Sequence, residues 1–319
     1  MQIIPLTEET KSNIMENLLK RSPNNYNEYQ DTVNEILQEV RIKGDEAVFA
    51  YTKKFDKADI SAENLYVTED EIKEAYAQVD DALVETMKKS IINIQSFHEK
   101  QVRNSWFHTR EDGVILGQRV TALNSVGVYV PGGKAAYPSS VLMNIIPAKV
   151  AGVKRIVMCT PPDAEGKVTP ATLVAAHLAG ATEIVKAGGA QAIAALAYGT
   201  AAIPKVDKIT GPGNIFVALA KKTVYGHVSI DSVAGPSEIL VLADETATPR
   251  YVAADLLSQA EHDELASAIL VTTSRELAEQ VSAQVEEFTA KLSRQSIIAK
   301  SLDNYGYILV ADTMDEAIE

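Results

Sequence analysis

Four glycine-rich segments combine residue types that could hold a ligand close to the backbone. Each follows a short apolar run, and three of them end at or near an amide or hydroxyl side chain, namely Gln191, Asn214 and Ser237. Glycine lets a ligand approach the main chain, and the N–H groups at the start of a following helix favour anions such as a pyrophosphate. Any one segment is also an ordinary turn of a parallel sheet, but four together favour a ligand-binding edge. The segments are Val130–Lys134, Ala187–Gln191, Thr210–Asn214 and Ser232–Glu238.

The usual phosphate-binding fingerprints are missing from these segments. Gly211 and Gly213 begin a G-x-G-x-x-G pattern, but Phe216 stands where the third glycine belongs, and Pro212 stiffens the turn. The sequence also has no Walker A loop and no G-x-S-x-G elbow, so the commonest NTPase and hydrolase classes are excluded. A dinucleotide would therefore be held differently from the standard Rossmann mode.

A second group of candidates lies at the end of an expected helix over residues 248–262. Gln259 and His262 are three residues apart, so both side chains can reach a common point. Histidine is the commonest metal ligand among side chains, whereas a glutamine oxygen is an unusual one. The pair is therefore either part of a metal site or the solvated end of a helix, and its spacing alone leaves both interpretations open.

The remaining histidines and the single cysteine have structural interpretations. His98 and His108 lie in or after a long polar helix, His177 lies on an alanine-rich helix, and His227 lies in a turn. Cys159 ends an apolar strand, which is typical of a small core residue and not of a nucleophile.

From residue 125 onward, each short apolar run is followed by glycine or proline, and most of these connections lead to a helical stretch. This order predicts a parallel α/β sheet covered by helices on both faces. A second set of strands and helices follows Pro236 and predicts a second parallel sheet. The expected strands are Val126–Val130, Arg155–Cys159, Glu183–Ala187, Lys208–Thr210, Val228–Ile230, Ile239–Ala243, Ala268–Thr272 and Tyr307–Ala311.

The region before residue 125 is expected to be helical from 28 to 104, with a hairpin over residues 114–123. We therefore predict two Rossmann-like α/β domains. Residues 28–124 and 236–319 would form a discontinuous first domain, and residues 125–235 an inserted second domain, after an N-terminal helical extension over residues 1–27. Residues 312–319 look like the first turn of a helix, from which we expect the natural sequence to continue.

Bulk composition narrows the class of protein. The 319 residues are 46% hydrophobic and 23% charged, as in globular proteins, and carry a formal net charge of −13. An acidic chain is repelled by phosphate backbones, so we expect no nucleic-acid partner. One cysteine, no signal-peptide pattern and no long apolar run favour a cytoplasmic protein without a membrane partner.

Five longer strings resemble histidinol dehydrogenase in their order and spacing, and the similarity runs from about residue 30 to the end of the sequence. Five motifs in register are far more specific than any single glycine loop. The strings are Gly127–Gly133, Gly188–Gly199, Val206–Asn214, Ala234–Glu238 and Asp255–His262.

The resemblance implies a function in histidine biosynthesis. That family oxidises L-histidinol to L-histidinal and then to L-histidine, with two NAD used in succession and one zinc per subunit. By position, Tyr129, Gln191 and Asn214 would contact NAD, and Ser237 would contact substrate. Gln259 and His262 would ligate zinc and hold the substrate near it, and the full-length protein would be a homodimer.

The sequence departs from the family pattern in one important respect. The family's catalytic Glu-His pair, its Asp zinc ligand and a His zinc ligand given by the partner subunit all follow the strand that matches Tyr307–Ala311. None of them can be placed before Glu319, so no catalytic residue is assigned. A catalytic zinc site needs about three protein ligands, and two are present. We therefore expect a truncated and inactive form of the enzyme.

Two alternatives belong to other classes. The first is a non-catalytic dinucleotide-binding module or assembly partner that keeps the same scaffold. The second is a general aldehyde dehydrogenase-like enzyme, against which the position of Cys159 in a strand argues.

Overall fold

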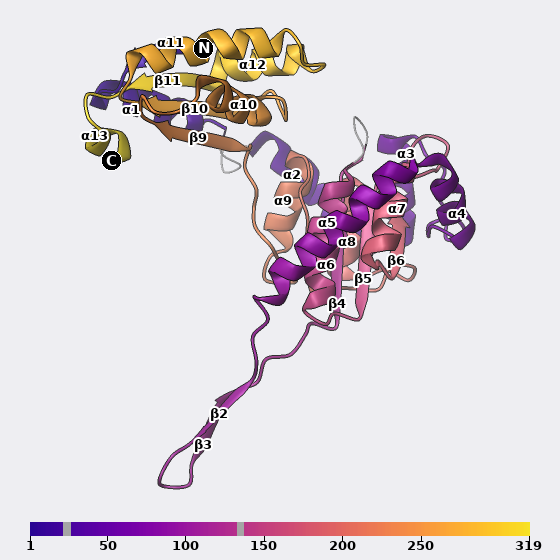
Figure 1. The fold of residues 1–319 in the computed structure, drawn as a ribbon. Helices are drawn as coiled ribbons and strands as arrows, with labels where there is room; N and C mark the ends of the chain where they lie inside the picture. Colours follow the sequence, from indigo (N-terminus) through magenta and orange to yellow (C-terminus); the bar gives the residue numbers. More distant parts are fainter. Residues whose placement is uncertain (22–26, 133–136) are drawn as a thin grey trace. The chain divides into compact units, whose positions relative to one another are not determined.

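The chain forms two compact units in a computed structural model that describes residues 1–21, 27–132 and 137–319. Unit 1 comprises residues 1–26 and 234–319, and unit 2 comprises residues 27–233. Figure 1 traces the two units and carries the labels used below. Within the described ranges, no helix is both long and apolar enough to cross a membrane.

Unit 2 is built on a five-stranded parallel sheet in the order β6-β5-β4-β7-β8. The chain passes from β4 to β5 and β6 on one side, and then crosses to β7 and β8 on the other side of β4. Doubly wound sheets bind ligands at the carboxyl ends of the strands beside such a reversal. The strands are β4 Ser125–Tyr129, β5 Arg155–Thr160, β6 Glu183–Lys186, β7 Lys208–Thr210 and β8 Ser229–Ile230.

Helices cover both faces of this sheet. On one face, α6 and α7 pack with α4 and α5 around a core that includes Val128 and Met158. On the other face, α8 and α9 pack with α2 and α3, and Gly127 of β4 lies so close to Leu196 of α8 that a Cβ would meet it at 2.8 Å. The helices are α2 Asn27–Lys43, α3 Asp45–Asp56, α4 Glu69–Gln78, α5 Asp81–Glu99, α6 Pro138–Val150, α7 Pro170–Ala179, α8 Gly189–Tyr198 and α9 Ile215–Val224.

A two-stranded antiparallel hairpin, β2 Trp106–Thr109 and β3 Ile115–Gln118, connects α5 to β4. All eight of its strand residues are exposed, and Figure 1 shows it extending away from the sheet of unit 2. Its turn is closed by the N–H of Arg110, which donates to the carbonyl of Val114 at 2.9 Å. The hairpin expected over residues 114–123 therefore begins earlier than predicted.

Unit 1 has a four-stranded parallel sheet in the order β1-β11-β10-β9. One face packs on α10, α11 and α12 through a core that contains Leu256, Leu270 and Ile308. The other face packs on α1 through Ile14 and Leu309. The elements are β1 Gln2–Pro5, α1 Glu8–Leu19, β9 Glu238–Ala243, α10 Pro249–Ala260, β10 Ser267–Thr272, α11 Arg275–Thr289, α12 Gln295–Tyr305, β11 Gly306–Val310 and α13 Met314–Ile318.

The predicted class, two Rossmann-like parallel α/β domains, is confirmed, but the structure divides the chain differently from the expected boundaries. Residues 27–124 belong with residues 125–233, because α2 and α3 pack on α8 and α9 and because α4 and α5 pack on α6 and α7. The N-terminal segment, expected as an extension over residues 1–27, is integrated into unit 1. Its strand β1 pairs with β11, with Ile3 opposite Ile308.

Candidate functional site

The carboxyl edge of the sheet in unit 2 carries three of the predicted ligand-binding segments. They follow β4, β6 and β7, so the strand order places them along one edge. Of the segment Val130–Lys134, Gly133 and Lys134 lie outside the described residues. The loops after β4, β5 and β6 meet at Pro161: a Cβ on Gly132 would lie 2.6 Å from its ring, and one on Gly188 2.5 Å from its Cβ. These two glycines are therefore required by the packing of the loops themselves.

Tyr129 ends β4 and points toward the loop after β6. It is 3% exposed, and its hydroxyl oxygen accepts a hydrogen bond from the Gly189 N–H at 3.0 Å. Burial is the main reason why the pKa of this phenol is raised to about 12. The hydroxyl therefore stays protonated at neutral pH and can donate its own hydrogen to a ligand.

Gln191 lies in the first turn of α8 and is 1% exposed. Both polar atoms of its amide, Nε2 and Oε1, are buried without a hydrogen-bond partner among the described residues. Buried polar groups are nearly always paired, and leaving one unpaired costs about 1–3 kcal/mol. A third such atom, Oγ1, belongs to Thr210, the last residue of β7 at the same edge. These unpaired groups fit a ligand that supplies both donors and acceptors.

Asn214 has a structural role that its motif did not reveal. It is the N-cap of α9, where its side-chain oxygen accepts a hydrogen bond from the Val217 N–H at 3.2 Å. The residue is exposed, so the rest of its amide remains accessible at the sheet edge. Capping by Asn typically stabilises a helix by about 1 kcal/mol, and this role is compatible with ligand binding.

Two residues that the sequence did not single out hold the loop after β7. Lys221 of α9 is 3% exposed, and its Nζ donates to the Gly211 carbonyl at 2.8 Å and pairs with Asp231. The Asp231 carboxylate in turn accepts from the Gly211 N–H at 2.8 Å. The signal was present, because Lys221 lies at helical spacing from Val217 and Val224, on the buried face of the helix.

Unit 1 carries the other three predicted residues. Ser237 is exposed immediately before β9, where its carbonyl accepts from the Ser267 N–H at 3.1 Å. Gln259 lies in the last turn of α10, and the His262 N–H donates to the Gln259 carbonyl at 3.1 Å. The turn brings Gln259 and His262 to the same end of one helix, as their spacing predicted.

The donor set for zinc is incomplete in this part of the chain. Apart from residues 22–26 and 133–136, no group of three or more His, Cys, Asp or Glu side chains is placed to hold a metal ion. Gln259 and His262 supply two donors, one of which is a neutral amide. Because catalytic zinc normally has three protein ligands, this pair alone does not form such a site.

The residues interpreted as structural have contacts that agree with that view. His177 Nδ1 lies 3.0 Å from the Tyr76 hydroxyl, and His98 Nδ1 lies 2.7 Å from the Gln101 amide oxygen. Cys159 is fully buried, and burial raises the pKa of its thiol to about 12. A thiol in this state is a poor nucleophile, which argues against aldehyde dehydrogenase chemistry at this residue.

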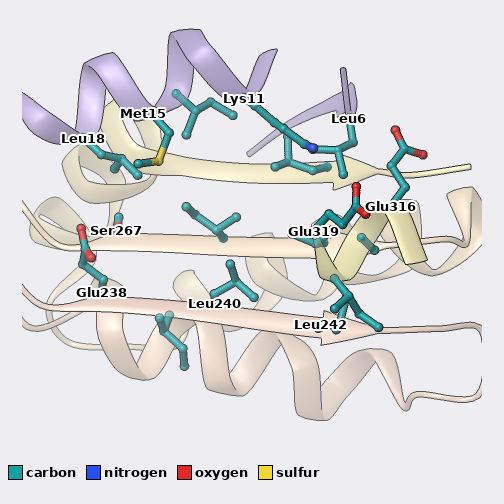
Figure 2. A pocket seen from close by; sticks show the side chains of 17 residues that line it. Leu6, Lys11, Met15, Leu18, Glu238, Leu240, Leu242, Ser267, Glu316 and Glu319 are labelled. Carbon is teal, nitrogen blue, oxygen red and sulfur yellow. The ribbon is translucent and has the colours of Figure 1, made fainter. Parts of the chain in front are cut away.

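A groove of about 550 Å³ in unit 1 has a different character. Figure 2 shows the side chains of Leu240, Leu242 and Met15 along it, between α1 and the strands of the sheet. Leu240 is 62% exposed, because β9 is the edge strand and α1 covers the part of this face that lies away from β9. The lining is mostly aliphatic, so the groove has few groups that could take part in catalysis.

Two parallel α/β units, one with unpaired polar groups at the carboxyl edge of a doubly wound sheet, define a Rossmann-like protein with a candidate nucleotide site. The family model described as histidinol dehydrogenase matches residues 19–319. The chain therefore belongs to the histidinol dehydrogenase family, a family of oxidoreductases of histidine biosynthesis.

Relatives of known name agree with this assignment. The chain is 58% identical over 292 residues to histidinol dehydrogenase of Bacillus subtilis, an alignment that covers 92% of this chain and 68% of that protein. It is 56% identical over 289 residues to the enzyme of Halalkalibacterium halodurans, with 91% and 68% covered. The crystal structure of histidinol dehydrogenase from Elizabethkingia anophelis matches with a TM-score of 0.91 at 41% identity, covering 99% of this chain and 72% of that one.

Proposed function

We propose that this chain provides the NAD site and part of the substrate site for the oxidation of L-histidinol to L-histidine through L-histidinal. The observation that carries the proposal is the amide of Gln191, buried at the start of α8 with both polar atoms unpaired. A ligand that pairs these atoms recovers the free energy that their burial costs. The reaction is the one that the family resemblance implies, and the polar groups at the sheet edge of unit 2 are of the kind that can bind its NAD.

In this proposal, the residues of unit 2 bind and orient the cofactor. The protonated Tyr129 hydroxyl donates a hydrogen bond, the Gln191 amide both donates and accepts, and Asn214 offers its exposed amide at the end of β7. NAD, when bound, supplies the acceptor for hydride. Fixing its position relative to the substrate carbon is the contribution that a protein scaffold makes to hydride transfer.

In the same proposal, unit 1 binds the substrate through Ser237, Gln259 and His262. The two-donor set of Gln259 and His262 does not complete a zinc site, so we derive no step through the metal. Removal of a hydride also requires a base for the hydroxyl proton, which typically contributes about 10²–10⁴-fold. No residue of this sequence matches the family's Glu-His pair. We therefore expect the 319-residue chain to bind NAD without turnover, and we include in the proposal the homodimer that the family resemblance implies.

The test is a calorimetric titration of NAD into the chain and its Gln191→Leu variant, with Gln78→Ala as the control. Leucine fills a similar volume without polar atoms, so folding should be preserved or improved. Loss of two hydrogen bonds should weaken NAD binding by about 5–100-fold. Gln78 is exposed on α4, and its substitution should change nothing. Equal NAD affinity in the chain and in Gln191→Leu would contradict the assigned site.

A second measurement addresses turnover. L-histidinol and NAD are added to the 319-residue chain, and NADH is followed by absorbance. We expect no NADH, and formation at an ordinary enzymatic rate would show that a base within these residues had been overlooked.

A further inference from the structure

Arg21 is a buried charged residue that no step of the proposed function uses. It follows α1 in the chain and is only 2% exposed. Its backbone N–H donates to the Leu18 carbonyl at 3.1 Å, so its main chain continues the last turn of α1. Taking a guanidinium out of water costs free energy unless the group is paired and hydrogen-bonded. Its partners therefore show what the burial of this side chain achieves.

The guanidinium of Arg21 contacts the amino ends of three strands of the sheet in unit 1. Its Nη2 atom pairs with Glu238, the first residue of β9, at 2.5 Å. Its Nη1 atom donates to the carbonyl of Leu265, which shortly precedes β10. The group also lies over the ring of Tyr305, immediately before β11, 4.6 Å from the ring centre. One side chain thus joins the starts of β9, β10 and β11.

Two of these contacts fix segments that carry predicted substrate residues. Ser237 directly precedes Glu238, and its carbonyl accepts a hydrogen bond from the Ser267 N–H at 3.1 Å. Glu238 and Ser267 are partners in the strand register and lie side by side in Figure 2. Leu265 belongs to the loop that leads from His262, at the end of α10, to β10. The arginine therefore holds both segments at the same edge of the sheet.

The loop after His262 can transmit this constraint to the histidine, because it is short and internally bonded. The Leu265 N–H donates to the Asp263 side chain at 2.9 Å, and the Ala266 N–H donates to the Asp263 carbonyl at 3.0 Å. At the other end of the loop, the His262 carbonyl accepts from Arg294 at 3.3 Å. A loop fixed at both ends holds the histidine in one place relative to the start of β10.

The chemistry of arginine explains why this residue type occupies the position. A guanidinium presents several N–H groups in a rigid plane, so two of its nitrogen atoms can donate to two different segments, whereas lysine has a single ammonium group. A buried ion pair adds little net stability compared with apolar side chains of similar size. The Glu238 side chain is also 60% exposed, so water still solvates much of it. The main effect of the contact is therefore to fix the geometry of the two segments.

We propose that Arg21 is a positioning residue of the substrate site. Its guanidinium fixes the segment that carries Ser237 relative to the loop that follows His262, so that both residues can contact one small molecule. The inference rests on the proposed binding of L-histidinol by unit 1 and adds to it a residue from the N-terminal segment. A site that is fixed in advance binds more tightly, because ordering a loop on binding costs free energy.

The test is the substitution Arg21→Lys in the 319-residue chain, which keeps the charge and loses the two-pronged contact. Arg275→Lys is the matched control, because Arg275 pairs with Glu279 at 3.1 Å on the exposed side of α11 in the same unit. Hydrogen exchange is followed by mass spectrometry. In Arg21→Lys, exchange in the peptides that contain Leu265 and Ser267 should be faster by about 10-fold or more. The control should exchange like the parent chain.

The ring signals of the histidines in NMR spectra give a local reading of the same effect. The chain has five histidines, and all except His262 belong to unit 2. In the histidine-labelled chain, Arg21→Lys should shift or broaden the His262 signal and leave the other four unchanged. L-histidinol is then titrated into the metal-free chain and followed by this signal. It should bind Arg21→Lys about 5-fold or more weakly than the parent chain and Arg275→Lys.

The outcomes separate this inference from the function on which it rests. Unchanged exchange, His262 signal and L-histidinol affinity in Arg21→Lys refute the positioning role and leave the function standing. A change in all five histidine signals also refutes it, since the effect would then be general. If Arg21→Lys does not fold, Glu238→Gln decides by the same readings, because it weakens the contact from its exposed side. If the parent chain shows no response to L-histidinol, the substrate part of the proposed function is refuted, and exchange and the His262 signal decide whether Arg21 holds the two segments.

Discussion

Replacing Lys221 by methionine tests whether the clamp on Gly211 holds the loop after β7. Lys221 Nζ binds the Gly211 carbonyl at 2.8 Å, and Asp231 accepts from the Gly211 N–H at 2.8 Å. The two side chains also pair with each other. Both hydrogen-bonding groups of Gly211 are thus held, at a residue whose φ of 116° favours glycine. Methionine keeps the apolar stem of lysine and removes only the charged donor.

The size of the effect follows from what remains after the substitution. The lost charge-assisted hydrogen bond contributes about 1.5–3 kcal/mol. Breaking a fully buried pair would cost about 3–5 kcal/mol, but the Asp231 side chain is 33% exposed and keeps the N–H groups of Gly211 and Ser232 as donors. We therefore expect a loss of about 2–4 kcal/mol. In a unit of this size this lowers the melting temperature by about 5–15 °C.

The assay is thermal unfolding followed by circular dichroism, with Lys89→Met as the matched control. Lys89 lies on α5 of the same unit, is exposed, and carries the same charge, so its substitution should change the melting temperature by no more than about 2 °C. Equal melting temperatures for Lys221→Met and Lys89→Met would refute the clamp. We also expect Lys221→Met to weaken NAD binding, because Asn214 follows the clamped loop.

Three further predictions concern charge and metal binding. Asp56→Asn should stabilise the chain above pH 6 and have little effect near pH 4. The pKa of the Asp56 carboxyl is raised from 3.8 to about 6, so its ionisation increasingly destabilises the folded chain as the pH rises through this range, and asparagine removes that ionisation. The full shift corresponds to about 3 kcal/mol, and partial exposure reduces this to about 1–2 kcal/mol; urea unfolding at pH 4 and pH 8 measures it. Zinc should bind weakly or not at all, since Gln259 and His262 leave half of the coordination shell to water, and stoichiometric zinc after dialysis of chelator-free protein would contradict this. His262→Ala should lower the melting temperature by less than about 4 °C, because an exposed side chain at a helix end packs little, and a larger drop would indicate a structural histidine.

Much of the fold could be predicted because its signals are local. The strands of both sheets are short apolar runs bounded by glycine or proline, and β5 over Arg155–Thr160 differs from its predicted range by one residue. The helix α10 begins with Pro249 in its first turn, as predicted; Thr248 occupies the N-cap position, although its side chain makes no capping hydrogen bond. Periodicity of about 3.6 residues also identified the helical region before β4.

Which of these elements contact one another could not be predicted, because the local sequence of a strand or helix does not show its partner in the fold. The strand β1 covers only Gln2–Pro5, and its partner β11 begins at Gly306. The periodicity of α2 and α5 shows that each has an apolar face, but not which sheet that face meets. Assigning these helices to the sheet of residues 236–319 was therefore wrong, since the apolar surfaces of α8, α9 and α6 accept them instead.

The site was predictable to the extent that it depends on motifs. Glycine-rich loops predicted a site at the carboxyl edge of the sheet, and the family resemblance supplied Tyr129, Gln191 and Asn214 as its candidate residues. A sequence does not show whether a buried amide has a hydrogen-bond partner, so the argument for Gln191 as a binding residue depends on the structure.

The unpaired groups of unit 2 are the strongest argument that its sheet edge is a binding site. Folded proteins leave few buried polar atoms unsatisfied, and the exceptions concentrate where function opposes stability. Gln191 in the first turn of α8 and Thr210 at the end of β7 have buried polar atoms without a partner among the described residues, and both lie at the carboxyl edge of the sheet. Buried atoms of the same kind also occur on α3, at Asp45, Thr52 and Asp56, so only those at the strand ends bear on the site. A ligand with hydroxyl and amide groups would complete the hydrogen bonds of Gln191 and Thr210.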